Sequence, residues 1–189
     1  MSAPGARLAG RPVTIIGAGI GGLAAALALA RRGAAVRVLE QAPDLAEVGA
    51  GLQVSPNGAR VLDALGLGAA LAGRGVRARG VRLLEHRGGR EITHLDLAGA
   101  PDGYFFIHRA DLHGMLADAA RAAGVEIRTG ATVTAARAGA DGWRLTLAGG
   151  DVEAAALVIG ADGLHSVLRP ALGNAEAARF TGQVAWRAT

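Results

Sequence analysis

Three glycines near the start of the chain have the spacing of a phosphate-binding turn. Gly17, Gly19 and Gly22 form a G-x-G-x-x-G pattern directly after an apolar run. In such a pattern the first glycine permits a tight turn, the second lets a diphosphate approach the backbone, and the third lets a helix pack closely on a strand. The chemistry that these residues predict is therefore nucleotide binding.

An acidic residue lies downstream at the distance that a nucleotide site requires. Glu40 can accept hydrogen bonds from the 2′-hydroxyl of a ribose, whereas its carboxylate would repel a 2′-phosphate. We therefore expect an adenosine with a free ribose, as in FAD or NAD. The residues that we expect to bind this cofactor include Ala18, Gly21 and Gln41 as well.

The elements that must position these residues are indicated by the hydrophobic pattern. Strands are predicted at Val13–Ile16 and Val36–Leu39, with a helix from about Gly21 to Arg32 between them. The helix would direct its free N–H groups and the positive end of its dipole at the phosphates. Gly33 is predicted to end it in a left-handed conformation. A glycine-rich turn in another α/β unit would explain the glycines, but not the strands, helix and acid at these distances.

Residues 13–30 also allow two interpretations without a nucleotide. A signal peptide would explain an apolar run preceded by Arg7 and Arg11, and a membrane span would explain its length. The glycines inside the run argue against both, because a span needs about 20 strongly apolar residues. We therefore expect no membrane association.

The composition limits the other kinds of chemistry. The chain has 189 residues, no cysteine, a net charge of +4 and 3% aromatic residues, and all 20 of its basic residues are arginine. Without cysteine there is no thiolate metal site, and without lysine there is no P-loop. A nucleic-acid surface would require clustered basic residues with interleaved aromatics. We therefore expect a cytoplasmic protein that binds neither a metal nor nucleic acid.

The remaining elements alternate between helix and strand. After Glu40 we predict a loop over 41–54, a helix from Ser55–Pro56 to Gly66 and a short helix over 67–72. A β-rich stretch over 76–107 follows, with a hairpin turn at 88–89 and a strand at Tyr104–Ile107. A helix is then predicted over Asp111–Ala123. Then follow a strand at Val125–Arg128, a three-stranded meander over 132–154, a buried parallel strand at Ala156–Ile159, a short helix over 164–172 and the start of a strand at Phe180–Ala188. Met115 lies on the apolar stripe of its helix and is expected in the core.

Four stretches together resemble the FAD-dependent aromatic-ring monooxygenases, the group that contains para-hydroxybenzoate hydroxylase and salicylate hydroxylase. They are Val13–Glu40, Glu47–Asn57, Ile107–Leu112 and Gly160–Arg169. The first stretch would fit many flavin and nicotinamide enzymes, whereas the third and fourth, in this order and spacing, are far more specific. The similarity is greatest to the salicylate hydroxylase branch and covers nearly the whole chain.

The resemblance implies roles for residues whose types alone leave alternatives open. It places Arg109 across the pyrophosphate as a bidentate contact, where the residue alone also allows a surface salt bridge. It ties Asp162 to FAD and the pyridine nucleotide, where the residue alone allows an Asp-Gly turn. It places Gly51, Leu52 and Gln53 beside the flavin ring, where the pattern alone allows an ordinary loop.

The fold class that follows is α/β: a Rossmann-like, doubly wound FAD-binding domain with a β-meander, interrupted by the beginning of a β-rich substrate domain. Residues 11–75 and 108–175 are assigned to the first domain, and residues 76–107 and 176–189 to a partial substrate-domain sheet. The implied activity is hydroxylation of an aromatic acid or phenol with NADH or NADPH and O₂, with no catalytic residue assigned. Two alternatives stay open: another FAD- or NAD-dependent oxidoreductase, and a non-catalytic FAD-binding remnant.

Members of this family are considerably longer than the chain, by the same resemblance. We therefore expect an N-terminal fragment that binds FAD poorly and does not turn over in isolation. We also expect exposed apolar surface on the FAD-binding domain, and an unpaired strand edge near Phe180–Trp186. The sequence does not indicate the substrate, the choice between NADH and NADPH, or the oligomeric state.

Overall fold

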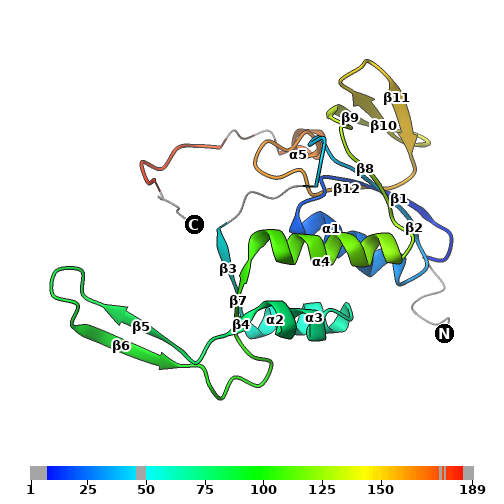
Figure 1. Ribbon diagram of the computed structural model, residues 1–189. Helices are drawn as coiled ribbons and strands as arrows, with labels where there is room; N and C mark the ends of the chain where they lie inside the picture. Colours follow the sequence, from blue (N-terminus) through cyan, green and yellow to red (C-terminus); the bar gives the residue numbers. More distant parts are fainter. Residues whose placement is uncertain (1–7, 46–49, 175, 177, 185–189) are drawn as a thin grey trace. The chain divides into compact units, whose positions relative to one another are not determined.

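The chain folds into two compact units (Figure 1). The computed structural model describes residues 8–45, 50–174, 176 and 178–184. Of these described residues, the first unit comprises those in 8–45 and 116–184, and the second comprises residues 50–115. The assignment of residues to a FAD-binding domain and a substrate domain concerns function, so it stays a prediction.

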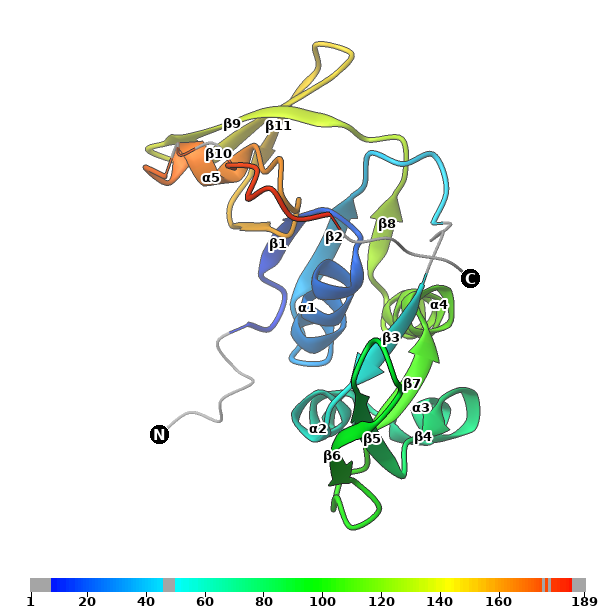
Figure 2. The same cartoon turned by 90° about the vertical axis from the view of Figure 1, so that its left-hand side faces the viewer.

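A parallel sheet forms the centre of the first unit. Its strands are β1 (Pro12–Ile16), β2 (Ala35–Leu39), β8 (Glu126–Arg128) and β12 (Val158–Gly160), in the order β12-β1-β2-β8. All neighbours are parallel, so strands that are distant in the sequence lie side by side (Figure 2). The four predicted strands are confirmed, but β12 lies at the sheet edge and is only half-buried, whereas a buried strand was expected. The carboxyl ends of all four strands meet at one edge.

Helix α1 (Ile20–Ala30) connects β1 to β2 and packs on both strands. It ends as predicted, at a left-handed glycine: Gly33 has a φ of +86°. The Gly33 N–H donates to the Ala30 carbonyl at 2.8 Å, and the Ala34 N–H donates to the Leu29 carbonyl at 3.1 Å. These two bonds form a Schellman motif, which satisfies carbonyls that the helix end would otherwise leave unpaired.

A three-stranded antiparallel meander covers the other face of the sheet. Its strands are β9 (Val133–Gly139), β10 (Gly142–Leu147) and β11 (Val152–Ala155), in the order β11-β10-β9. The predicted meander is therefore confirmed. The helix expected over 164–172 is shorter, because only α5 (Leu168–Ala171) is helical.

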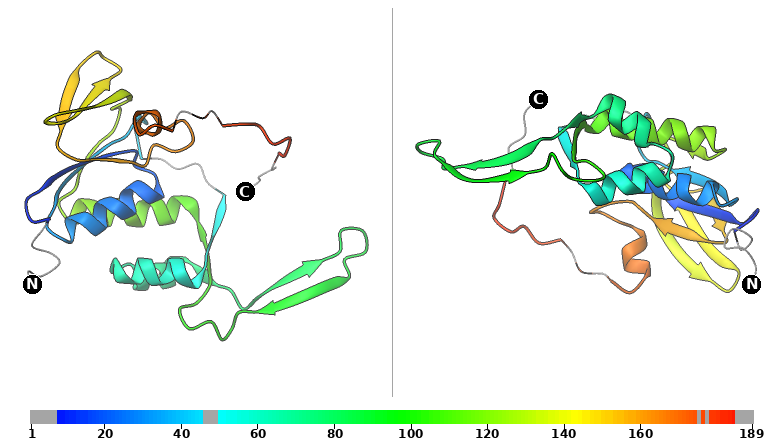
Figure 3. Two further views of the ribbon diagram at one scale, coloured as in Figure 1. Left: turned by 180° about the vertical axis from the view of Figure 1, so that it is seen from behind. Right: turned by 90° about the horizontal axis from the view of Figure 1, so that it is seen from below.

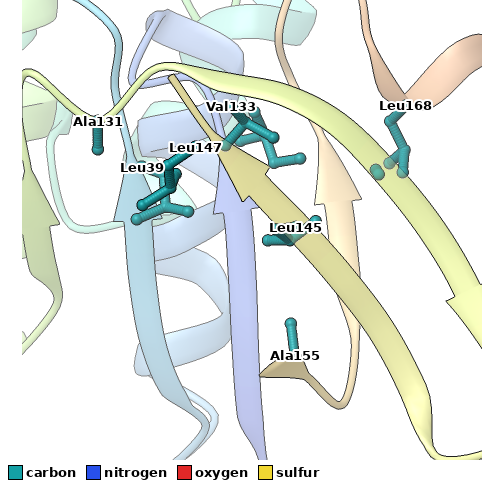
Figure 4. Close-up of a cluster of buried hydrophobic side chains, with 9 residues drawn as sticks. Leu39, Ala131, Val133, Leu145, Leu147, Ala155 and Leu168 are labelled. Atoms are coloured by element: carbon teal, nitrogen blue, oxygen red, sulfur yellow. The ribbon is translucent and has the colours of Figure 1, made fainter. Parts of the chain in front are cut away.

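The core of the first unit lies between the sheet and the meander. Figure 4 shows β10 in front of β1 and β2, with apolar side chains from both layers between them. Leu145 is fully buried at its centre. The cluster consists of Ile16, Leu39, Ala131, Val133, Ala136, Leu145, Leu147, Ala155 and Leu168.

An ionic bridge joins the meander to the sheet beside this core. Glu153 on β11 accepts hydrogen bonds from Arg37 of β2 at 2.8 Å and from Arg128 of β8 at 2.6 Å. The hydrogen bond from Arg128 is the main cause that lowers the pKa of Glu153 below its ordinary value of 4.5; the positive charges of Arg128 and Arg37 add to it, and partial burial opposes it. The carboxylate is therefore held in its charged form.

The second unit is built around a small antiparallel sheet of β3 (Gly51–Val54), β7 (Phe105–His108) and β4 (Val76–Arg77), in the order β3-β7-β4. Helices α2 (Pro56–Ala64) and α3 (Gly68–Arg74) belong to it, and α4 (Arg109–Ala122) begins in it. The predicted helices are confirmed, and Met115 is buried as expected. The loop predicted over 41–54 is wrong at its end, because β3 pairs with a strand about fifty residues later, which no local pattern reveals.

A hairpin of β5 (Gly80–Leu84) and β6 (Glu91–Asp96) extends from the rest of the second unit (Figure 3). Every residue of β6 is exposed, and the exposed apolar side chains of the hairpin are Leu83, Leu84, Ile92 and Leu95. The predicted hairpin is thus present. In the stretches assigned to the FAD-binding domain, the exposed apolar side chains include Val152, Leu157 and Leu164. Of the strand expected at Phe180–Ala188, residues 180–184 form no strand, and residues 185–188 lie outside the described part.

Leu145→Ala is expected to lower the free energy of unfolding by about 2–5 kcal/mol, because it removes a fully buried side chain and leaves a cavity between two layers. Leu172→Ala is the matched control. Leu172 is 67% exposed, so its truncation should change the free energy of unfolding by less than about 0.5 kcal/mol. Urea unfolding followed by circular dichroism measures both. Equal effects of the two substitutions would contradict the assignment of Leu145 to the core.

Glu153→Gln is expected to lower the free energy of unfolding at neutral pH by at most about 1 kcal/mol. Because folding lowers the pKa of Glu153, its contribution is complete above the unfolded-state pKa and is lost as pH falls through the folded-state value. The difference from the unsubstituted protein should therefore shrink below pH 4.5. Urea unfolding at a series of pH values measures it. A difference that grows on acidification would show that the sign is wrong, and Glu91→Gln, whose carboxylate is 4.0 Å from Arg82, serves as the exposed control.

Candidate functional site

A cavity of about 220 Å³ lies at the edge of the first unit where the parallel strands end. The register places Ile16 beside both Leu39 and Gly160, so the residues that follow β1, β2 and β12 come together. In open α/β sheets, ligands bind at the carboxyl ends of the strands. They bind at the point where the connections from two neighbouring strands run in opposite directions. Five predicted cofactor-binding residues line the cavity: Gly17, Gly19, Glu40, Gln41 and Asp162.

Two of the three motif glycines are required by the protein's own packing. Gly17 has a φ of +100°, and a Cβ there would overlap the carbonyl oxygen of Ala161. A Cβ on Gly22 would overlap the carbonyl oxygen of Gly17. The turn after β1, the first turn of α1 and the end of β12 therefore meet backbone to backbone, as the roles predicted for the first and third glycines require.

Gly19 differs, because nothing in the protein requires a glycine there. Its φ of −66° is open to any residue, and a Cβ on it would meet no atom within 4 Å. Gly19 nevertheless lines the cavity. The space in front of its backbone is therefore available to a ligand. Gly21 also has open space around it but does not line the cavity.

The start of α1 suits an anion. Gly19 is the N-cap residue, no side chain caps the helix, and the first turn carries no acidic residue. The first N–H groups of a helix have no partner within the helix, and its dipole favours negative charge there. A diphosphate in front of Gly19 would supply the missing acceptors, so these residues fit a dinucleotide cofactor.

Glu40 is held in place by the backbone around the cavity. Its Oε2 accepts a hydrogen bond from the Ala18 N–H at 2.6 Å, and its Oε1 accepts one from the Ala42 N–H at 2.9 Å. A carboxylate has about four acceptor positions, so capacity remains for ribose hydroxyls. Through this hydrogen bond the Ala18 N–H fixes the orientation of Glu40, and the direct contact of Ala18 with the cofactor stays a prediction.

Asp162 lies beside the glycine turn but also has a structural task. Its backbone nitrogen is close to the position that a Cβ on Gly17 would take, and its side chain lines the cavity. Its Oδ2 accepts hydrogen bonds from the N–H groups of Val167 at 2.7 Å and Leu168 at 3.4 Å. The Asp-Gly turn and the nucleotide role therefore do not exclude each other, because Oδ1 is the oxygen left for a ligand.

The other predicted residues belong to the second unit. Gly51, Leu52 and Gln53 form most of β3, and Arg109 is the first residue of α4, with its N–H donating to the Ala50 carbonyl at 3.2 Å. Gly51 pairs with His108, so the strand and Arg109 are neighbours. Tyr104 donates a hydrogen bond from its hydroxyl to Oε1 of Gln53 at 2.7 Å. The contact of Arg109 with a diphosphate stays a prediction, and residues 47–49 of this motif lie outside the described part.

Several residues of the cavity were not predicted. They are Ile16, Leu39, Ala131, Val133, Ala161, Gly163, His165 and Val167. Ala131 lies in the connection between β8 and β9, Val133 is the first residue of β9, and Figure 4 shows both with Leu39 in the buried cluster. Their small or apolar side chains carry no chemical signal in the sequence. Only the order of the strands, which places β8 beside β2, could have indicated them.

The described residues also bear on metal binding and on membrane-spanning helices. In the part of the chain that the structure describes, no three His, Asp or Glu side chains are placed to share a metal ion. Across these described residues, too, no helix has both the length and the apolar character needed to cross a membrane. His113 is one of the buried polar side chains.

Comparison with known proteins supports a site for FAD. Residues 11–188 match the family model described as the FAD binding domain. Over 93% of its length the chain is 42% identical to 3-amino-4-hydroxybenzoate 2-monooxygenase of Streptomyces cremeus, covering 45% of that protein. It is 40% identical to 3-hydroxybenzoate 6-hydroxylase 1 of Aquipseudomonas alcaligenes, covering 46% of that protein. The chain thus spans about half the length of the curated relatives it matches.

A solved structure agrees with these relatives. The tetrameric form of 2-methyl-3-hydroxypyridine-5-carboxylic acid oxygenase superposes with a TM-score of 0.77 and 33% identity, over 87% of this chain and 42% of the other. The family model covers nearly the whole chain, and the predicted fold class, with its parallel sheet and meander, is confirmed. The chain therefore belongs to the FAD-binding domain family of the FAD-dependent aromatic-ring monooxygenases.

Proposed function

We propose that the chain binds FAD with the adenosine diphosphate portion in the cavity at the carboxyl edge of the parallel sheet. The observation that carries this proposal is Gly19, a glycine that neither backbone conformation nor packing requires, in front of which a cavity opens beside an uncapped helix start. A protein that needed only a turn could carry a side chain there. The open backbone suits a group that approaches closely and brings negative charge.

The residues of the cavity divide the recognition of the cofactor between them. The backbone from Gly17 to Gly19 and the start of α1 would hold the diphosphate, and Glu40 would accept hydrogen bonds from the ribose. Asp162, fixed through Oδ2, would direct Oδ1 at a ribose hydroxyl or at an arginine beside the phosphates. In the second unit, Arg109 would contact the pyrophosphate, and β3 would lie beside the flavin ring.

For the activity, we propose hydroxylation of an aromatic acid or phenol using NADH or NADPH and O₂. The relatives named above act, by their names, on hydroxybenzoates, which supports a small aromatic acid as the substrate class. Bound FAD would supply the redox chemistry. The chain's own residues bind and orient it, so no catalytic residue is assigned.

Gly19→Ala is expected to weaken FAD binding at least tenfold (about 1.4 kcal/mol) while leaving the free energy of unfolding nearly unchanged, because its methyl group enters only the cavity. Gly22→Ala should instead destabilise the fold, because its Cβ overlaps the Gly17 carbonyl. Gly114→Ala, which meets no atom within 4 Å, is the control for both measurements. Equilibrium dialysis with FAD and urea unfolding separate the two effects. If Gly19→Ala binds FAD as tightly as the unsubstituted chain, the diphosphate is not held there.

The activity can be tested in a chimera in which residues 1–189 replace the matching part of 3-hydroxybenzoate 6-hydroxylase. We expect the chimera to retain FAD and to oxidise NADH faster when 3-hydroxybenzoate is added, because the cofactor site would be shared between the two portions. The isolated chain should show neither a stoichiometric yellow complex nor stimulated oxidation. A folded chimera that binds FAD but gives no aromatic-dependent oxidation would favour another oxidoreductase or a remnant.

A further inference from the structure

We propose that Glu153, on the meander, is a positioning residue for the nucleotide cavity and acts on it through Arg128. This inference rests on the proposed binding of FAD. Glu153 and its two arginine partners are absent from the cavity lining, so any effect on a ligand must be transmitted. The effect would pass from the Glu153 carboxylate to Arg128 at the end of β8, and from there to Glu40, which follows β2.

The carboxylate of Glu153 lies between two guanidinium groups on adjacent strands. It accepts from Nη1 of Arg37 at 2.8 Å and from Nη1 of Arg128 at 2.6 Å. Arg37 is fixed further, since its Nε donates to Oγ1 of the buried Thr14 at 2.9 Å and its Nη2 donates to the Ala154 carbonyl at 3.2 Å. One carboxylate thus joins β11 to both β2 and β8.

Arg128 is the last residue of β8, and the connection that follows it forms one wall of the cavity. The Arg128 carbonyl accepts a hydrogen bond from the Glu40 N–H at 2.9 Å, and the Glu40 carbonyl accepts one from the Ala131 N–H at 2.8 Å. The Gly130 N–H donates to the Ala42 carbonyl at 2.8 Å. Backbone hydrogen bonds therefore join the segment at Glu40 to the segment from Arg128 to Ala131, which lines the cavity. A shift of Arg128 would move both segments.

Electrostatics explains why the charge at position 153 matters. Arg37 pairs in register with Glu126, two residues before Arg128, so both arginines lie on the face of the sheet that the meander covers. The side chain of Glu153 is 22% exposed and those of Arg37 and Arg128 are 31% and 45% exposed, so water screens their charges only in part. Without the carboxylate, like charges on neighbouring strands would repel each other beside Glu40 and Ala131.

The test measures the affinity of the chain for FAD and for ADP by equilibrium dialysis, at a temperature where every variant is folded. We expect Glu153→Gln to weaken both ligands about threefold and Glu153→Arg about tenfold (about 1.4 kcal/mol). Combining Glu153→Arg with Arg128→Glu restores the charge composition of the cluster, one carboxylate and two guanidinium groups. The double variant should therefore recover affinity to within about threefold of the unsubstituted chain.

Val36→Ala controls for general destabilisation of β2. Val36 is buried on the opposite face of that strand, so its truncation should lower stability without changing affinity. If the Glu153 variants lose stability but bind both ligands normally, Glu153 is only structural and the inference is overturned. Failure of the double variant to recover would also overturn it. If neither the unsubstituted chain nor the chimera described above binds FAD, the proposed function itself fails. If Glu153→Arg does not fold, Glu153→Gln decides.

Discussion

The first unit depends on the meeting of three backbone segments at a distance that excludes side chains. The turn at Gly17, the first turn of α1 at Gly22 and the end of β12 at Ala161 are so close that a methyl group on either glycine would overlap a carbonyl oxygen. This contact fixes where α1 starts relative to the sheet. Because the helix start is fixed, the backbone at Gly19 is held facing the cavity.

The two faces of the parallel sheet serve different purposes. One face receives α1, whose buried residues are small or aliphatic, and this packing sets the direction of the helix axis. The other face receives the meander, whose apolar residues form the core and whose Glu153 joins two strands. The cavity lies at the carboxyl ends of the parallel strands, beside the start of α1 and the edge of the core. Leu39, Ala131 and Val133 therefore belong both to the core and to the lining of the cavity.

The sequence predicts the local parts of this structure well and the non-local parts poorly. The glycine turn, α1, its end at Gly33 and the meander follow from residue types that act over a few positions. Strand β3 and the wall at Ala131 depend on partners distant in the chain, and neither has a composition that sets it apart from a loop. The bond from the Ala18 N–H to Glu40 was likewise not foreseen, because an acid at the end of a strand gives no indication of its partner.

The hairpin of β5 and β6 has a consequence for the dynamics of the chain. A two-stranded ribbon exposed on both faces gains little from burial, so its own hydrogen bonds must balance the entropy of ordering it. Its amide protons should therefore exchange with solvent by local opening, long before those of β1 and β2. The chain thus combines a sheet edge that is fixed by close backbone contacts with a ribbon that we expect to open locally while the core stays intact.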